Sequence, residues 1–200
     1  MFYKSTESTF GMNNKLSIIE TSISGAVIIQ SAVYVDNRGS FCELFNKSLL
    51  RAVGIEFDVI QENLVVCNKG ALRGMHFQKQ YPQAKLVKVL RGSIFDVIVD
   101  LRKDSKTYKE SFSFVLTEND NMQLYIPKGL AHGCLALEDG TVFSYLTDES
   151  YHPEDESGIL WNDPEFGIEW PIGDYVRENE VCMLDETQII INERDMSWKR

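Results

Sequence analysis

Two ionisable side chains stand in neighbouring strand-like runs near the middle of the chain, and together they could carry out proton chemistry. His76 lies in the run 72–78, and Lys85 lies in the apolar run 84–90 that follows the next turn. Burying either charged group without a partner is costly, so an ordinary half-buried sheet rarely carries both. An imidazole titrates near neutral pH and can act as a base, whereas an ammonium can stabilise a developing negative charge. The stretch 72–100 is therefore predicted to form the floor of a site.

His132 ends a second informative stretch, Ile-Pro-Lys-Gly-Leu-Ala-His at 126–132. The form P-x-G-x-x-H is similar to the second motif of the cupin barrels, in which the turn sets a corner and the His projects into the barrel. The first cupin motif usually supplies two His separated by one residue, plus a Glu, as metal ligands, but no second His follows His76 at that spacing. The chain has three His, and His152 lies in an acidic turn. The sequence therefore predicts no metal site and disfavours a metal-dependent oxygenase.

The elements that would position these residues are short strands. From Ile18 onward the chain alternates short β-like segments with turns rich in Gly, Asn and Asp, which predicts an all-β antiparallel sandwich or barrel, and the cupin-like motif at 126–132 favours the barrel. One helix is expected from about Ser48 to Val53, with Ser48 as its cap and Gly54 at its end. Residues 1–16 are expected to be a loosely ordered extension, and 17–200 a single domain that includes an irregular C-terminal segment.

Composition limits the classes of protein to which the chain can belong. With 200 residues, 44% of them hydrophobic, it is long enough for one well-cored domain. The net charge of -10 argues against a nucleic-acid partner, which needs a concentrated basic face. The four Cys form no CxxC pair, no apolar run reaches membrane-spanning length, and the N-terminus lacks the apolar core of a signal peptide. The sequence therefore predicts a soluble, cytoplasmic protein with reduced thiols.

Further motifs occur in the order and spacing of one protein family. They are Asp36-x-Arg38-Gly39-x-Phe41-x-Glu43, Gln61-x-Asn63, 72–78, 83–87, 126–133, Tyr145 with Tyr151 and Pro153, 158–164 and 168–171. Each motif would be weak alone, but their joint order over about residues 18–171 is specific, and a tail piece follows near 192–198. On these motifs the chain resembles the dTDP-4-dehydrorhamnose 3,5-epimerase family.

The resemblance implies a jelly-roll barrel that dimerises and acts in deoxysugar biosynthesis as an isomerase without a cofactor. It implies epimerisation of dTDP-4-dehydro-6-deoxy-D-glucose at C3 and C5, which gives dTDP-4-dehydro-L-rhamnose through enolate intermediates. A C–H beside a ketone is acidic only when the enolate is stabilised, so such a site needs a base, an oxyanion partner and an acid on the opposite face. The expected partners are a thymidine diphosphate sugar and a second copy of the chain.

The family motifs imply catalytic roles for four residues. His76 would be the base, Tyr145 would return a proton from the opposite face, and Lys85 would lie near the ketone oxygen. The resemblance also implies that a tail carboxylate orients the imidazole. Residues 191–195 are similar to the family motif L-S-x-K-D, which assigns this role to Asp195. Asp185 is a rival, because the segment between 171 and 192 is longer than is usual in the family.

Other residues are implied to bind the substrate, some of them from a neighbouring subunit. Within one subunit they are Arg73 for the diphosphate, Gln61 for the thymine edge, and Asn63, His132 and Tyr151 near the substrate. Those that would reach the nucleotide across a dimer interface are Arg38, Phe41 and Glu43. Ideal strand alternation would place Arg73 and His76 on opposite faces, so Gly74 is predicted to mark a bulge that turns one of them.

Several positions depart from the family pattern. Val65 and Cys67 stand where the family usually has Ser, Leu146 stands where it has Lys, and Ser150 where it has an aromatic residue. These departures leave open an epimerase that inverts only C3 or only C5 of a related nucleotide-linked 4-ketosugar. A non-catalytic cupin that binds a sugar nucleotide and a metal-dependent cupin oxygenase are the alternatives from other classes.

Overall fold

Strands dominate the computed structural model, which describes residues 9–10, 15–173 and 184–198. The strands are β1 (Thr9–Phe10), β2 (Leu16–Glu20), β3 (Val27–Ser31), β4 (Val33–Asp36), β5 (Gly39–Cys42), β6 (Gln61–Cys67), β7 (Leu72–Gln78), β8 (Lys85–Arg91), β9 (Ser93–Asp100), β10 (Ser111–Thr117), β11 (Met122–Ile126), β12 (Leu130–Ala136), β13 (Thr141–Thr147) and β14 (Glu156–Gly158). The helices are α1 (Lys47–Ala52), α2 (Glu193–Met196) and the 3-10 turns η1 (Pro164–Phe166) and η2 (Glu186–Gln188). Within the described ranges, no helix is long and apolar enough to span a membrane.

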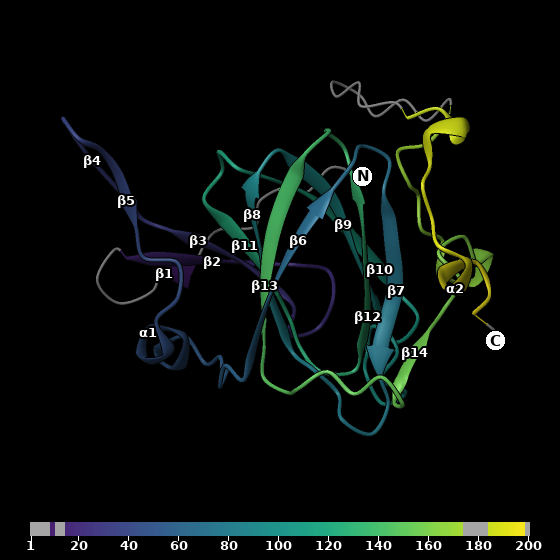
Figure 1. Cartoon of the computed structure of the whole chain (residues 1–200). Coiled ribbons are helices and arrows are strands. Elements are labelled where there is room, and N and C mark those ends of the chain that lie inside the picture. Colours follow the sequence, from purple (N-terminus) through teal and green to yellow (C-terminus); the bar gives the residue numbers. More distant parts are fainter. Residues whose placement is uncertain (1–8, 11–14, 174–183, 199–200) are drawn as a thin grey trace.

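Two antiparallel sheets face each other and form the barrel (Figure 1). The larger sheet has the order β1-β2-β3-β11-β8-β13-β6, and the smaller has the order β10-β9-β12-β7-β14. Neighbours such as β11 and β8, or β12 and β7, are distant in sequence, so the chain crosses repeatedly between the two sheets. This arrangement confirms the expected jelly roll.

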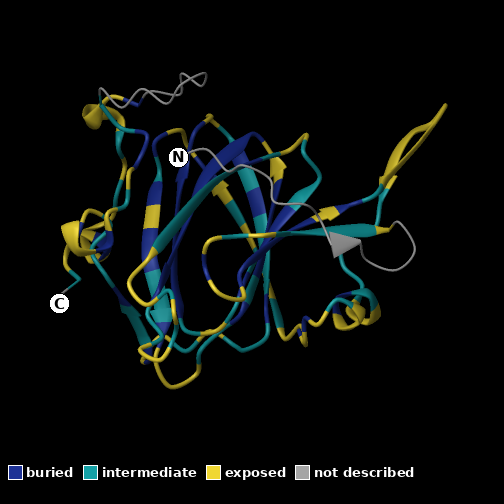
Figure 2. Ribbon diagram, turned by 180° about the vertical axis from the view of Figure 1, so that it is seen from behind, coloured by how far each residue is buried: buried dark blue, intermediate teal, exposed yellow. Residues whose placement is uncertain are grey.

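The core lies between the sheets and is built from alternate residues of the facing strands. Val87, Val89 and Phe143 of the larger sheet pack there with Ile94 and Ile98 of the smaller one. A second apolar cluster covers the outer face of the smaller sheet, where Phe95, Val97 and Val99 meet Trp170 of the C-terminal segment. Because both of its faces are covered, β9 is buried at every position (Figure 2). The C-terminal segment is therefore packed against the barrel wall that carries β7.

The helix α1 begins one residue earlier than the sequence suggested. Its N-cap is Asn46, whose side chain accepts hydrogen bonds from the N–H groups of Ser48 and Leu49. The expected cap, Ser48, is therefore the second residue of the helix. The helix buries Leu50 beside Phe57 against the outer face of the larger sheet. It ends at Ala52, with Val53 as its C-cap and Gly54 in the left-handed conformation after that.

One N-terminal hairpin extends beyond the barrel wall. The hairpin β4–β5 projects away from the barrel as a two-stranded arm (Figures 1 and 2). Its apolar side chains are exposed, with Val35 at 77% and Phe41 at 67%. Of the expected N-terminal extension, Thr9–Phe10 forms β1 and pairs with β2, while residues 1–8 and 11–14 lie outside the described part of the chain.

Candidate active site

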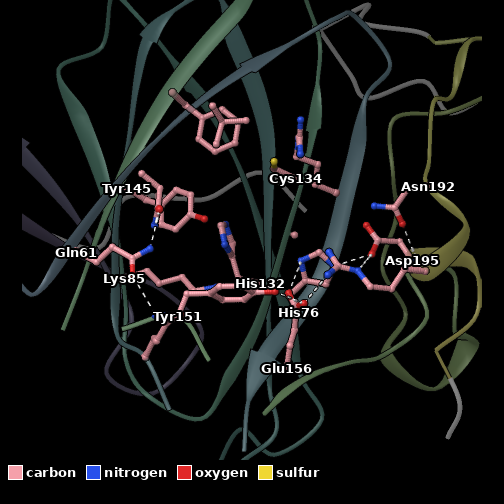
Figure 3. A pocket seen from close by; sticks show the side chains of 17 residues that line it. Gln61, His76, Lys85, His132, Cys134, Tyr145, Tyr151, Glu156, Asn192 and Asp195 are labelled. Carbon is pink, nitrogen blue, oxygen red and sulfur yellow. Dashed lines mark hydrogen bonds and ion pairs between the residues drawn. The ribbon is translucent and has the colours of Figure 1, made fainter. Parts of the chain in front are cut away.

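A pocket of about 290 Å³ opens between the two sheets at one end of the barrel (Figure 3). Nine of the twelve residues expected to act in catalysis or binding line it. They are the four expected catalytic residues His76, Tyr145, Lys85 and Asp195, and five expected binding residues, Arg73, Gln61, Asn63, His132 and Tyr151. The larger sheet supplies one wall through β6, β8 and β13, and β7, β12 and the C-terminal segment supply the other.

A bulge in β7 brings Arg73 and His76 into the same pocket. In the pairing of β7 with β12, His76 lies opposite His132 and Arg73 lies opposite Cys134. Three steps along β7 therefore match two steps along β12, which confirms the bulge expected at Gly74. Gly74 has φ of +117°, and a Cβ there would lie 2.5 Å from the Cα of Gly133. Only glycine fits this position, since both the conformation and the close approach exclude a side chain.

Asp195 holds the ring of His76 from behind. Its Oδ1 lies 2.7 Å from Nε2 of His76, and its Oδ2 accepts a hydrogen bond from the Gly74 N–H at 3.1 Å. Burial by itself would raise the pKa of Asp195, but the hydrogen bond and charge of His76 lower it below its ordinary value. An ionised carboxylate can only accept, so Nε2 carries the proton and the neutral ring keeps a lone pair on Nδ1. The lone pair makes Nδ1 the available base.

The short helix α2 positions Asp195 beside His76. Asn192 caps this helix, and its side chain accepts a hydrogen bond from the Asp195 N–H at 2.7 Å. Asp195 is fully buried as a result. The rival residue Asp185 lies elsewhere, because it caps η2 by accepting a hydrogen bond from the Thr187 N–H and is exposed. Of the two candidates, the fold brings only Asp195 to the imidazole.

Tyr145 and Lys85 stand on the wall opposite His76. They lie on the neighbouring strands β13 and β8, and the ammonium of Lys85 is 6.0 Å from the centre of the Tyr145 ring. Burial raises the pKa of the Tyr145 phenol, which keeps it protonated as a proton donor. Burial also lowers the pKa of Lys85 to about 8, although the carboxylates of Asp96 and Glu156 oppose the change. The pocket thus places a base and an acid on facing walls, with a cation beside the acid.

The polar residues around this pair are held by hydrogen bonds. His132, opposite His76 on β12, contacts Asp96 of β9 through Nε2 at 2.5 Å. The amide of Gln61 donates to Asn63 at 2.8 Å and accepts from the Tyr151 N–H at 3.0 Å. These contacts orient the side chains before any ligand binds, as expected for a preformed binding site.

Arg38, Phe41 and Glu43 do not line the pocket of their own chain. Arg38 pairs with Asp36 at the tip of the hairpin, and Phe41 is exposed on the same arm. Glu43 lies at the base of the hairpin and accepts a hydrogen bond from the side chain of Asn46 at 2.9 Å. Within one chain, these three residues therefore belong to a projecting arm and not to the cavity.

Sequence reasoning missed several residues that line the pocket, and Glu156 and Arg194 are the most notable of them. Glu156 belongs to an acidic run after His152 that indicates a solvated loop, so no sequence signal singled it out. Arg194 could have been found, because it precedes Asp195 in the tail motif. In the structure, Glu156 and Arg194 contact each other through an ion pair between the Arg194 guanidinium and Oε2 of Glu156.

Comparisons with known proteins identify the family of the chain. The family model of dTDP-4-dehydrorhamnose 3,5-epimerase matches residues 20–200. A dTDP-4-dehydrorhamnose 3,5-epimerase of Methanothermobacter thermautotrophicus is 46% identical over 181 residues, which cover 90% of this chain and 92% of that protein.

Solved structures with this fold include two relatives that carry sugar nucleotides. One is a dTDP-6-deoxy-D-glucose-3,5-epimerase from Legionella pneumophila in complex with dTDP-4-keto-L-rhamnose, with a TM-score of 0.80, 37% identity and coverage of 90% of this chain and 89% of that one. The other is a 3'-monoepimerase from Streptomyces bikiniensis in complex with dTDP-quinovose, with a TM-score of 0.74, 32% identity and coverage of 88% and 83%. Taken with the match along nearly the whole chain, they place this protein in the dTDP-4-dehydrorhamnose 3,5-epimerase family.

Proposed function

We propose that this protein converts dTDP-4-dehydro-6-deoxy-D-glucose to dTDP-4-dehydro-L-rhamnose by inverting C3 and C5 through enolate intermediates. The observation that carries the proposal is the placement of His76 and Tyr145 on facing walls of one pocket in a member of this family. Inversion requires a proton to leave one face of the carbon and another to arrive on the opposite face. The reaction involves no net oxidation or reduction, and the ketone already makes the C–H bonds beside it acidic enough for proton transfer.

The roles of the side chains follow from their positions. Nδ1 of His76 removes the proton beside the ketone, and Asp195 stabilises the imidazolium that forms through its contact with Nε2. Lys85 supplies the positive charge that stabilises the enolate oxygen. The phenol of Tyr145 then delivers a proton to the other face. The contact with Asp195 already orients the imidazole, so little reorganisation of the base is needed during the reaction.

The nucleotide part of the substrate would be held by the remaining polar residues. Arg73 can form paired hydrogen bonds to a diphosphate, and its Nε already donates to the sulfur of Cys67 at 3.3 Å. Gln61 and Asn63 lie together on β6 and would contact the thymine end, while His132 and Tyr151 would contact the sugar. The dTDP-sugars named in the two related structures support a ligand of this class.

Proton exchange with solvent tests the proposal directly. When the protein is incubated with dTDP-4-dehydro-6-deoxy-D-glucose in heavy water, deuterium should enter at C3 and at C5. Proton NMR reports the loss of each signal separately. Exchange at one carbon alone would establish the activity of a monoepimerase, a candidate supported by the likeness to the Streptomyces bikiniensis enzyme. Exchange at neither carbon, with dTDP bound, would leave a binding protein without turnover.

The charge of Lys85 predicts the alkaline limit of activity. Its pKa of about 8 means that the ammonium is charged at neutral pH and loses its proton as the pH rises through that value. The enolate then loses its cationic partner, so kcat/KM should fall above about pH 8. Profiles of kcat/KM measured from about pH 6 to about pH 10 would locate this alkaline limb, the part of the profile in which activity falls.

The variant Lys85→Arg provides the control for this limb, because a guanidinium stays charged throughout the range. Its profile should remain flat where that of the natural protein falls, even if its maximum is lower. An unchanged alkaline limb in Lys85→Arg would assign the titration to another group.

The same proposal includes a homodimer. The outer face of the larger sheet exposes Leu64, Val66 and Leu90, at 66%, 63% and 45%. Lys88 lies on this face with its Nζ buried and, among the described residues, without a hydrogen-bond partner. The projecting hairpin β4–β5 carries exposed apolar side chains and the acidic Asp36. A second copy would cover the apolar face with such an arm and bring Arg38, Phe41 and Glu43 toward the neighbouring pocket.

Adding a charge to this face should dissociate the dimer. In Val66→Asp, a carboxylate would have to be buried between the subunits, so the dissociation constant should rise by roughly a hundredfold or more. Sedimentation velocity at several concentrations measures the change. The control is Lys103→Asp, an exposed turn position after β9. If Val66→Asp sedimented like the natural protein, the interface would lie elsewhere.

A further inference from the structure

The arrangement of base and acid leaves the enzyme in the wrong protonation state after each inversion. Once His76 has taken a proton and Tyr145 has given one, the site holds an imidazolium and a phenolate. Neither can repeat its step until a proton leaves His76 and another returns to Tyr145. If C3 and C5 are both inverted, this reset must also occur between the two inversions. A route for the proton is therefore a requirement of the proposed function.

Glu156 lies at the free nitrogen of the base. Its strand β14 pairs with β7 and places Gly158 opposite His76. Its Oε1 is 4.0 Å from Nδ1 of His76, the ring nitrogen that does not contact Asp195. The side chain is 13% exposed, so this carboxylate is nearly enclosed by the site. A short movement of the imidazolium or the carboxylate would bring the two within hydrogen-bond distance.

Glu156 is also connected to the far side of the pocket. Its Oε2 accepts a hydrogen bond from the Tyr151 hydroxyl at 2.8 Å and forms the ion pair with Arg194. Tyr151 reaches the wall that carries Tyr145, since its N–H donates to Gln61 of β6, the strand that pairs with β13, and both tyrosines line the pocket. Glu156 and Tyr151 also help electrostatically to raise the pKa of the Tyr145 phenol. Tyr151 is 45% exposed and borders the mouth of the pocket, which gives the path access to water.

We propose that Glu156, together with the Tyr151 hydroxyl, is the proton relay that resets His76 and Tyr145. The inference rests on the proposed function. Glu156 takes the proton from Nδ1 of the imidazolium as Tyr151 passes its own proton toward the Tyr145 phenolate. The proton on Glu156 then moves to the Tyr151 oxygen. In sum, the imidazolium loses one proton, the phenolate gains one, and Glu156 and Tyr151 end unchanged. The ion pair with Arg194 holds the Glu156 carboxylate between His76 and Tyr151.

The variant Glu156→Gln separates a relay from a fixed counter-ion. A glutamine keeps the size of the side chain and can accept the hydrogen bond from Tyr151, but it cannot carry the proton. The matched control is Glu154→Gln, since Glu154 belongs to the same loop, is 73% exposed and contacts His152 outside the pocket. Deuterium incorporation from heavy water is followed by rapid quench with enzyme and substrate at comparable concentrations.

A relay predicts a burst in Glu156→Gln. The first inversion uses the resting protonation state, so about one deuteron per site should enter at the rate of the natural protein. Later turnovers should be about a hundredfold slower, which is the range of general acid–base effects. Added formate or imidazole should accelerate this slow phase, because a small base can carry the proton instead. Tyr151→Phe breaks the same path and loses a sugar contact, so it should show the same drop between the first and the later turnovers at a lower starting rate, and it serves as the second variant if Glu156→Gln does not fold.

Two results would overturn the relay. If Glu156→Gln matched Glu154→Gln and the natural protein in every phase, the proton would leave His76 directly to water. If the first turnover slowed as much as the later ones, and added bases had no effect, Glu156 would only position the imidazole. Failure of the proposed function looks different, because the natural protein itself would then incorporate no deuterium at C3 or C5.

Discussion

Replacing His76 by asparagine should abolish turnover while leaving the binding of dTDP nearly unchanged. Asp195 still accepts the hydrogen bond from the Gly74 N–H, so the buried carboxylate keeps a partner and the fold is preserved. It cannot remove a proton from carbon, and kcat should fall by about 10³–10⁴-fold, the upper range of general base catalysis. Substrate time courses by NMR measure the loss, and calorimetry with dTDP measures binding.

The control for this variant is His152→Asn. His152 stacks on Tyr81 at a ring separation of 4.2 Å and does not line the pocket, so its loss should leave kcat within about twofold. The base would have to be sought elsewhere if His76→Asn retained more than about a tenth of the natural rate. Loss of dTDP binding in step with turnover would instead indicate that the variant had damaged the pocket.

Replacing Tyr145 by phenylalanine should separate proton exchange from inversion. His76 would still remove a proton and could return a deuteron to the same face, so exchange in heavy water should continue within about tenfold of the natural rate. Delivery to the opposite face would lose its donor, and inversion should fall by about 10²–10³-fold. The product would be deuterated substrate with its original configuration. NMR coupling constants distinguish this species from the epimer.

Tyr125→Phe is the matched control, because Tyr125 lies on the opposite face of the same sheet and packs against Phe57 there. Its loss should change neither exchange nor inversion. Inversion at the natural rate in Tyr145→Phe would exclude Tyr145 as the acid. Loss of exchange together with inversion would show that the phenol is needed before the proton leaves carbon, for example to bind the ketone.

The residues proposed to carry the chemistry could be predicted from the sequence because they lie in contiguous motifs. His76, Lys85 and Tyr145 each stand in a short strand with a characteristic pattern, and the ordered motifs indicate the family. An antiparallel β sandwich or barrel could be predicted from the regular alternation of short strands and turn residues, and the family resemblance implied the jelly roll. Gly74 could be identified as a bulge, because simple alternation would otherwise separate Arg73 from His76.

Other features depended on contacts between distant segments, and no local pattern could specify them. Asp195 is the partner of His76 because it lies in the short helix that Asn192 caps, which points its carboxylate inward. Asp185 instead caps an exposed 3-10 turn. Glu156 resembles the solvated acids beside it until β14 pairs with β7 and carries it to the imidazole. Arg38, Phe41 and Glu43 match the family motif, yet the fold places them on an arm that leaves its own barrel.

The sequence alone determined which side chains could carry the reaction and which type of barrel would hold them, because residue type and strand periodicity are local properties of the chain. The tertiary structure alone decided which carboxylates meet the imidazole and which surfaces remain uncovered. Those outcomes depend on contacts across more than 100 residues, as between the Gly74 N–H and the Asp195 carboxylate, which are 121 positions apart. Such contacts are set by the packing of the whole chain and leave no signal in any one segment.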